Sequence, residues 1–164
     1  MTQAIDNKAF VDGLATACDN LGKLSGLAWK VESLGDPSSD LQEEAVEGVK
    51  MGVSSRLAPR FLLCAAKPDT QVIVDKVAAT YGIGAMDGAL VMAEIANIIF
   101  SDILNRMSVA SGEHLIVTTP EKTGGPRSDL LVSLAAGRGG RMVRARLAGN
   151  GGVSARLDIL AAFD

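Results

Sequence analysis

The segment from residue 85 to residue 108 constrains the fold of this chain more than any other part of the sequence. When the segment is drawn as a helix at about 100° per residue, its apolar side chains gather on one face. That face comprises Met92, Ala93, Ile95, Ala96, Ile99, Phe100, Ile103 and Met107. A helical face of this length needs an apolar layer beneath it. We therefore expect a long helix that packs against the core of the protein.

The opposite face of the same helix is mostly polar. It carries Asp87, Glu94, Asn97, Ser101, Asp102, Asn105 and Ser108, with Leu90, Val91 and Ile98 among them. Glu94 and Asn97 lie one turn apart and point away from the core, so a partner can reach both. Two interpretations remain open. An acid and an amide at so short a spacing are typical of a solvated helix face, whereas the apolar residues around them indicate a surface that a partner covers.

The remaining sequence alternates between strand and helix patterns. We predict helices over residues 8–27, 68–82 and 85–108, and strands over residues 28–35, 49–55, 60–66, 114–120, 129–137, 141–149 and 153–163. Loops are predicted over residues 36–48 and 121–128, and glycine turns over 137–140 and 149–152. This order predicts an α+β fold, a mostly antiparallel sheet with long helices packed on one face. Residues 1–164 are expected to form a single domain.

The composition excludes several classes of function. A net charge of −3 and 4% aromatic residues provide neither the basic surface nor the stacking platforms of a nucleic-acid binder. The apolar runs are shorter than the roughly 18 residues of a membrane span, so none is expected. The first residues lack the basic and apolar regions of a signal peptide. Cys18 and Cys64 stand in apolar surroundings and are predicted to be reduced core residues. We expect a cytoplasmic protein.

Other polar patterns have simpler structural explanations. Residues 135–152 contain repeated glycines but lack the Lys-Ser/Thr ending of a phosphate-binding loop, so hairpin turns are the better interpretation. Four arginines there form a small basic patch, either an exposed sheet face or a dock for an acidic partner: Arg138, Arg141, Arg144 and Arg146. His114 has no neighbouring His or Cys to complete a metal site. Asp102 and Asn105 are assigned to the solvent face of the long helix.

The spacing of three residues resembles a family signature. Glu94-x2-Asn97, followed by 22 residues and then Pro120, is similar to the motif of the CheC/CheX/FliY phosphatases, which act on phosphorylated chemotaxis response regulators. The likeness extends over residues 47 to 135, through "APRFLLCAAKPDTQVIVDKVAATYG", "AEIANIIFSDILNRM" and "HLIVTTP". The spacing of Glu, Asn and Pro is its most specific part.

The chain carries one copy of this motif and departs from it at two positions. The first helix reads "ACDN", in which Ala17 stands where a second copy would have its acid. A single copy resembles CheX, whose members pair as dimers through their sheets. Leu90 stands where Ser or Asp is usual in the family, and Ala93 stands where Gly is frequent.

By this resemblance the protein is a phosphatase that acts on a phosphorylated CheY-type receiver domain. Asn97 would orient the attacking water, because a carboxamide both donates and accepts hydrogen bonds, and Glu94 would dock on the regulator's lysine. Mg²⁺ is expected on the regulator, and neither a cofactor nor a metal on this chain. Two alternatives remain: a non-catalytic receiver-binding or flagellar-switch module, and a structural dimer subunit in which Glu94 and Asn97 have no role.

Overall fold

The computed structural model describes residues 7–35, 45–53, 60–135 and 142–162. In chain order its elements are α1 (Asn7–Ser25), β1 (Ala28–Gly35), β2 (Ala45–Gly52), β3 (Arg60–Ala66), α2 (Lys67–Thr80), α3 (Gly88–Ser111), β4 (Glu121–Pro126), α4 (Arg127–Ala135), β5 (Met142–Asn150) and β6 (Ser154–Ala162). The described strands form one six-stranded sheet in the order β1-β5-β6-β3-β2-β4, with every neighbouring pair antiparallel. This confirms the predicted α+β class.

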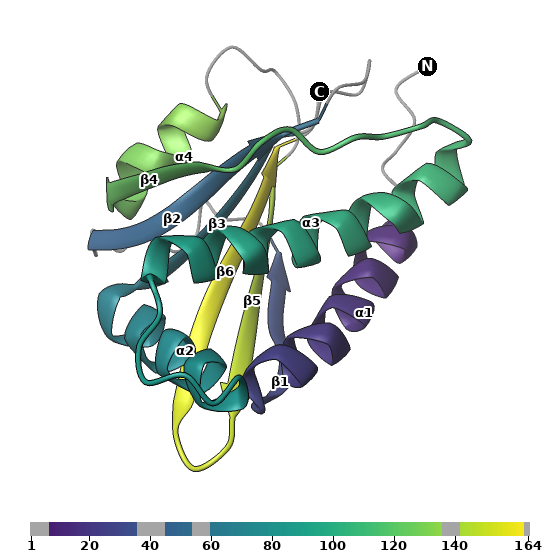
Figure 1. Cartoon of the computed structure of the whole chain (residues 1–164). Helices are drawn as coiled ribbons and strands as arrows, with labels where there is room; N and C mark the ends of the chain where they lie inside the picture. Colours follow the sequence, from purple (N-terminus) through teal and green to yellow (C-terminus); the bar gives the residue numbers. More distant parts are fainter. Residues whose placement is uncertain (1–6, 36–44, 54–59, 136–141, 163–164) are drawn as a thin grey trace.

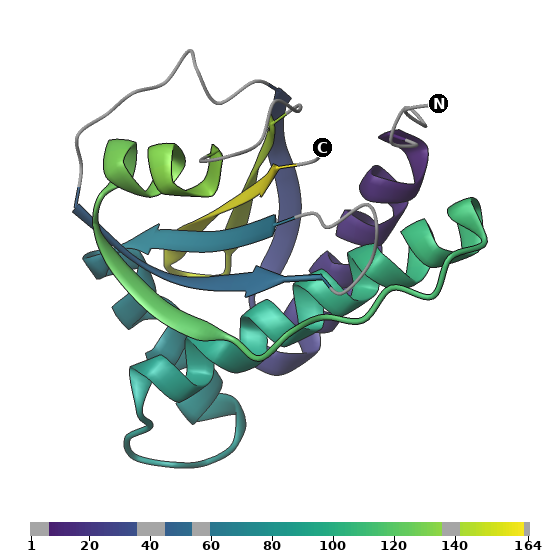
Figure 2. The same ribbon diagram turned by 90° about the horizontal axis from the view of Figure 1, so that it is seen from above.

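The helices form two layers on the sheet. Helices α1, α2 and α3 lie on one face, and α4 covers part of the other (Figures 1 and 2). The larger core cluster joins the three long helices to the sheet, and within it the Phe61 ring of β3 stacks on Phe100 of α3 with 4.7 Å between the ring centroids. Leu130, Leu131 and Leu134 of α4 belong to a second cluster on the opposite face. The prediction that long helices pack on one face is therefore confirmed.

Helix α3 is held at both ends and pressed closely against α1. The Asp87 side chain accepts a hydrogen bond from the Ala89 amide at the N-terminus, and Gly112 ends the helix with φ 72°, a left-handed conformation that favours glycine. At the crossing of α1 and α3, a Cβ built on Gly13 would lie 2.6 Å from Cα of Ile103. Only a glycine allows the two helix backbones to approach this closely.

The structure corrects three predicted elements around β4. Residues 114–120 do not form a strand, because within them only Val117 makes a bridge, to Val53. Residues 121–126, predicted as part of a loop, form the edge strand β4, which pairs with β2. Residues 127–135, predicted mainly as a strand, form helix α4.

Smaller differences concern β2 and the turns. Strand β2 begins at Ala45, so residues 45–48 are strand and not loop, whereas residues 36–44 lie outside the described residues. A turn joins β5 to β6 as predicted, with Gly152 at φ 80°, but it covers residues 151–153, because Gly149 and Asn150 are paired residues of β5. The turn predicted at 137–140 lies outside the described residues.

Two of the four predicted patch arginines surround a buried carboxylate on the α4 side of the sheet. Asp158 of β6 is 3% exposed. It accepts hydrogen bonds from Arg146 Nε at 2.9 Å, from Arg144 Nη2 at 3.5 Å and from Arg127 of α4. The prediction of an exposed basic face is thus wrong for Arg144 and Arg146, because this carboxylate holds both. Arg138 and Arg141 lie outside the described residues.

The buried cysteines and the long apolar helix agree with a packed core. Cys18 and Cys64 are both free and buried, which confirms their prediction as reduced core residues. Within the described ranges α3 alone is long and apolar enough to cross a membrane by length and composition. Nine of its apolar residues, from Val91 to Met107, are instead buried in the core, whereas Leu90 and Val109 near its two ends are exposed.

Candidate functional site

Helix α3 turns its predicted polar pair away from the core. Glu94 is exposed and Asn97 is half-buried, while the neighbouring Ile95 and Ala96 are 1% and 0% exposed. Val91, which the helical projection placed on the polar side, is only 3% exposed. That placement is wrong because Val91 lies one turn before Ile95 and shares the edge of the buried face.

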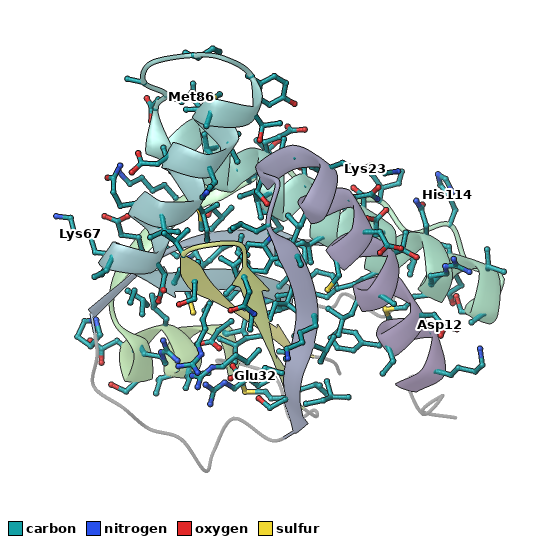
Figure 3. All side chains as sticks on the ribbon, turned by 90° about the horizontal axis from the view of Figure 1, so that it is seen from below. Asp12, Lys23, Glu32, Lys67, Met86 and His114 are labelled. Carbon is teal, nitrogen blue, oxygen red and sulfur yellow. The ribbon has the colours of Figure 1, made fainter. Side chains whose placement is uncertain are left out.

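An open pocket of about 540 Å³ adjoins the pair, between α1, α3 and the end of α2. Its lining residues are Asn20, Lys23, Leu24, Tyr81, Glu94, Asn97, Ile98, Ser101 and Asp102. Figure 3 shows α1 alongside α3, with Lys23 near the end of α1. Sequence reasoning found the α3 side of this pocket. It missed Lys23 and Tyr81, because no spacing in the sequence connects α1 and α2 with the motif.

The two helices are joined beside the pocket by a side-chain hydrogen bond. Asn20 Nδ2 of α1 donates to Asp102 Oδ2 of α3 at 2.8 Å. Asp102 is half-buried and hydrogen-bonded, and it lines the open pocket, so its assignment to the solvent face is correct only in part. Asn105 is exposed as predicted. Ala17 of α1 is 0% exposed. An acid at that position would lie in the core, so α1 presents no second copy of the pair.

The pocket contains charge of both signs. In the part of the chain that the structure describes, neither the Glu94 carboxylate nor the Lys23 ammonium has an ion-pair partner. In the same pocket lining, the Asn97 carboxamide offers one acceptor oxygen and two N–H donors. The pocket can therefore receive a partner that carries both a cation and an anion.

Among the described residues, those that line the pocket include no histidine, cysteine or metal-binding cluster. No cluster of three or more His, Cys, Asp or Glu residues that could hold a metal ion occurs among them. His114 is exposed and lies beyond the end of α3, outside the pocket lining. Burial raises the pKa of the Cys18 thiol to about 11 and that of Cys64 to about 12, so neither is an activated nucleophile. The site is suited to positioning a reactant by hydrogen bonds and charge.

The third member of the signature follows α3 in the chain. The segment after Gly112 runs back along α3 towards β4 (Figures 1 and 2). Pro120 ends this segment, is half-buried and directly precedes β4. It does not line the pocket with Glu94 and Asn97.

No protein-family model matches the chain, and no curated protein matches it in sequence. Solved structures do match. The chemotaxis protein CheX from Vibrio vulnificus has a TM-score of 0.69 at 13% identity, covering 96% of this chain and 99% of that one. FliY from Thermotoga maritima has a TM-score of 0.71 at 12% identity, with coverage of 98% and 91%.

The third solved structure that matches this chain is a complex of two proteins. A chain of the CheX–CheY–BeF3–Mg²⁺ complex from Borrelia burgdorferi has a TM-score of 0.58 at 10% identity, covering 97% of this chain and 98% of that one. Identities this low establish shared architecture and leave activity open. Over almost its whole length, the chain has the fold of the CheC/CheX/FliY chemotaxis proteins.

Proposed function

We propose that this protein accelerates the dephosphorylation of a phosphorylated CheY-type response regulator. The observation that carries the proposal is the placement of Glu94 and Asn97 at one open pocket, on a fold shared with CheX. A CheX with this fold has been solved together with CheY. Both side chains are accessible, and they come from a helix whose position is fixed by the core.

The reaction is hydrolysis of an aspartyl phosphate. The oxygen of one water molecule attacks phosphorus, and the bond between phosphorus and the aspartyl oxygen breaks. The products are the aspartate carboxylate and dihydrogen phosphate, so atoms and charge balance. Such phosphoryl transfer depends on positioning and on stabilisation of charge more than on a strong base.

Asn97 is assigned the role of orienting the water. Its carboxamide oxygen accepts a hydrogen bond from the water, while its nitrogen can donate to a phosphoryl oxygen. The Asn97 side chain is half-buried in the pocket lining, and a partly buried side chain has less conformational entropy to lose when it aligns the water. Mg²⁺ on the regulator would neutralise developing charge, and this chain would supply no metal.

Glu94 is assigned the role of docking on the regulator's lysine. The carboxylate is exposed one turn before Asn97, so a lysine held there sets the position of Asn97 over the phosphoryl group. A charged pair enclosed at such an interface fixes geometry more than it adds affinity. A Glu94→Lys variant should keep the fold and lose binding to the phosphorylated regulator, and unchanged affinity in a titration would contradict this role.

Phosphate release from a panel of phosphorylated receiver domains tests the proposal. Asn97→Ala should lower the accelerated rate about 100-fold, as loss of a positioned hydrogen-bonding group does in other enzymes. Asn105→Ala is the matched control, because Asn105 lies on the same helix, is exposed and does not line the pocket. Equal rates for the two variants would refute the assignment of Asn97.

A second candidate is a non-catalytic receiver-binding or flagellar-switch module. Leu90 favours it, because this departure from the family motif is 70% exposed one turn before Glu94, where it can contact a partner. Such a module would bind a receiver at a one-to-one ratio without consuming its phosphoryl group. Under either candidate this protein is expected to act in the cytoplasm. A homodimer formed through the sheet stays a prediction, and analytical ultracentrifugation can test whether the protein dimerises.

A further inference from the structure

We infer that Lys23 of α1 makes the site selective for the phosphorylated form of its partner. The inference rests on the proposed function and extends the site beyond the α3 motif. Lys23 is exposed in the last turn of α1 and lines the same pocket as Glu94 and Asn97. In Figure 3 it lies where α1 passes α3, far from Lys67 at the start of α2.

The backbone of Lys23 is held in a defined position relative to α3. One turn earlier, Asn20 donates its 2.8 Å hydrogen bond to Asp102. Closer to the N-terminus of α1, the contact of Gly13 with Ile103 brings the backbones of α1 and α3 together. The stem of the lysine therefore starts at a fixed point of the pocket wall, while its ammonium group can move to meet a ligand.

The charges around the pocket indicate that the Lys23 ammonium group can attract a phosphoryl group. Glu94 and Asp102 are both acidic, and a phosphoryl dianion that approached them alone would be repelled. Lys23 is the cation in the pocket lining and has no ion-pair partner among the described residues. When Glu94 engages the partner's lysine, Lys23 is available for the phosphoryl oxygens or for the acidic groups around them.

A simpler role for Lys23 is to stabilise the C-terminal end of α1, where a positive charge favours the helix dipole. That role would affect binding of both forms of the partner equally. Selectivity for the phosphorylated form would not be affected. The ratio of the two affinities therefore separates the alternatives.

The experiment measures the affinity of the full chain for one receiver domain with Mg²⁺ alone and with Mg²⁺ plus BeF3⁻, which mimics a phosphoryl group. Lys23→Gln should reduce the preference for the BeF3⁻ form about fivefold, the upper range for one exposed ion pair. Lys23→Arg should restore it. The control is Lys67→Gln, at the exposed first residue of α2 and away from the pocket, which should leave the preference unchanged.

Each other outcome has a definite meaning. An unchanged preference in Lys23→Gln, or equal weakening for both receiver forms, would overturn the inference while leaving the proposed function standing. If the unaltered protein bound no receiver in either form, the proposed function would fail and this inference would fail with it.

Discussion

Replacing Gly13 by alanine tests the contact that places α1 beside the functional helix. On propensity alone the change should stabilise α1 by about 1 kcal/mol, because alanine is the better helix former. The new Cβ would, however, lie 2.6 Å from Cα of Ile103 and 3.1 Å from the Asp102 carbonyl oxygen. Ordinary contacts between carbon atoms are about 3.5–4.0 Å, and backbone atoms cannot rotate away.

The helices must therefore separate by about 1 Å, which costs roughly 1–3 kcal/mol in a packed core. Because the contact is with backbone, we take the upper half of that range. After the gain in propensity, Gly13→Ala should destabilise the protein by about 1–2 kcal/mol. For a chain of 164 residues this lowers Tm by roughly 2–8 °C.

Thermal unfolding followed by circular dichroism measures this shift. The control is Ala15→Gly, at an exposed position of the same helix, which should cost about 1 kcal/mol through propensity alone. The two variants exchange the same residues in opposite directions, and both should lower Tm. A rise of Tm in Gly13→Ala would refute the close approach of α1 and α3, and with it the placement of Lys23 in the pocket.

Four further predictions concern the core and the departure from the motif. Asp158→Ala should lower the free energy of unfolding in urea by about 3–5 kcal/mol, because it leaves the buried Arg127 and the half-buried Arg144 and Arg146 without their shared carboxylate. The control Glu32→Ala, which removes an exposed partner of Arg156, should cost less than about 1 kcal/mol. Burial raises the pKa of Cys18 to about 11 and of Cys64 to about 12, so Ellman's reagent at pH 8 should react with both thiols only after unfolding. Both pKa values lie above the ordinary 9.0, so the unfolded chain loses these protons first and stability should fall as pH rises above about 9. Leu90→Ser should change the free energy of unfolding by less than about 0.5 kcal/mol, since the side chain is 70% exposed. The same variant should increase the rate of receiver dephosphorylation a few-fold. A slower reaction would instead identify Leu90 as a docking contact.

The long helices and the central strands could be predicted because their patterns come from burial on one face or both. Strand β3 and helix α3 were recognisable for this reason, from an uninterrupted apolar run and from apolar residues at helical spacing. Helix α4 was misassigned as a strand, although Leu130, Leu131 and Leu134 have helical spacing and are buried together. The short run of apolar residues around Val132 concealed that spacing.

Strand β4 could not have been found from local sequence. "EKTGGP" has neither alternation nor strand propensity, and it is a strand because β2 offers it a hydrogen-bonding edge. The α1 side of the candidate site could not have been found from local sequence either. Glu94 and Asn97 were evident from the spacing of one helix, whereas Asn20 meets Asp102 across 82 residues of sequence. Contacts of that kind depend on how the helices pack, which a local pattern does not contain.

Catalytic turnover is the most direct test of the central claim. Phosphate release should be followed with one molecule of this protein for about every hundred molecules of phosphorylated receiver. The proposed function predicts that each molecule releases many phosphates, and that Asn97→Ala lowers the accelerated rate about 100-fold while Asn105→Ala retains it. Release that stays at the receiver's own rate, with the protein bound at a one-to-one ratio, would contradict a phosphatase and establish a docking module in its place.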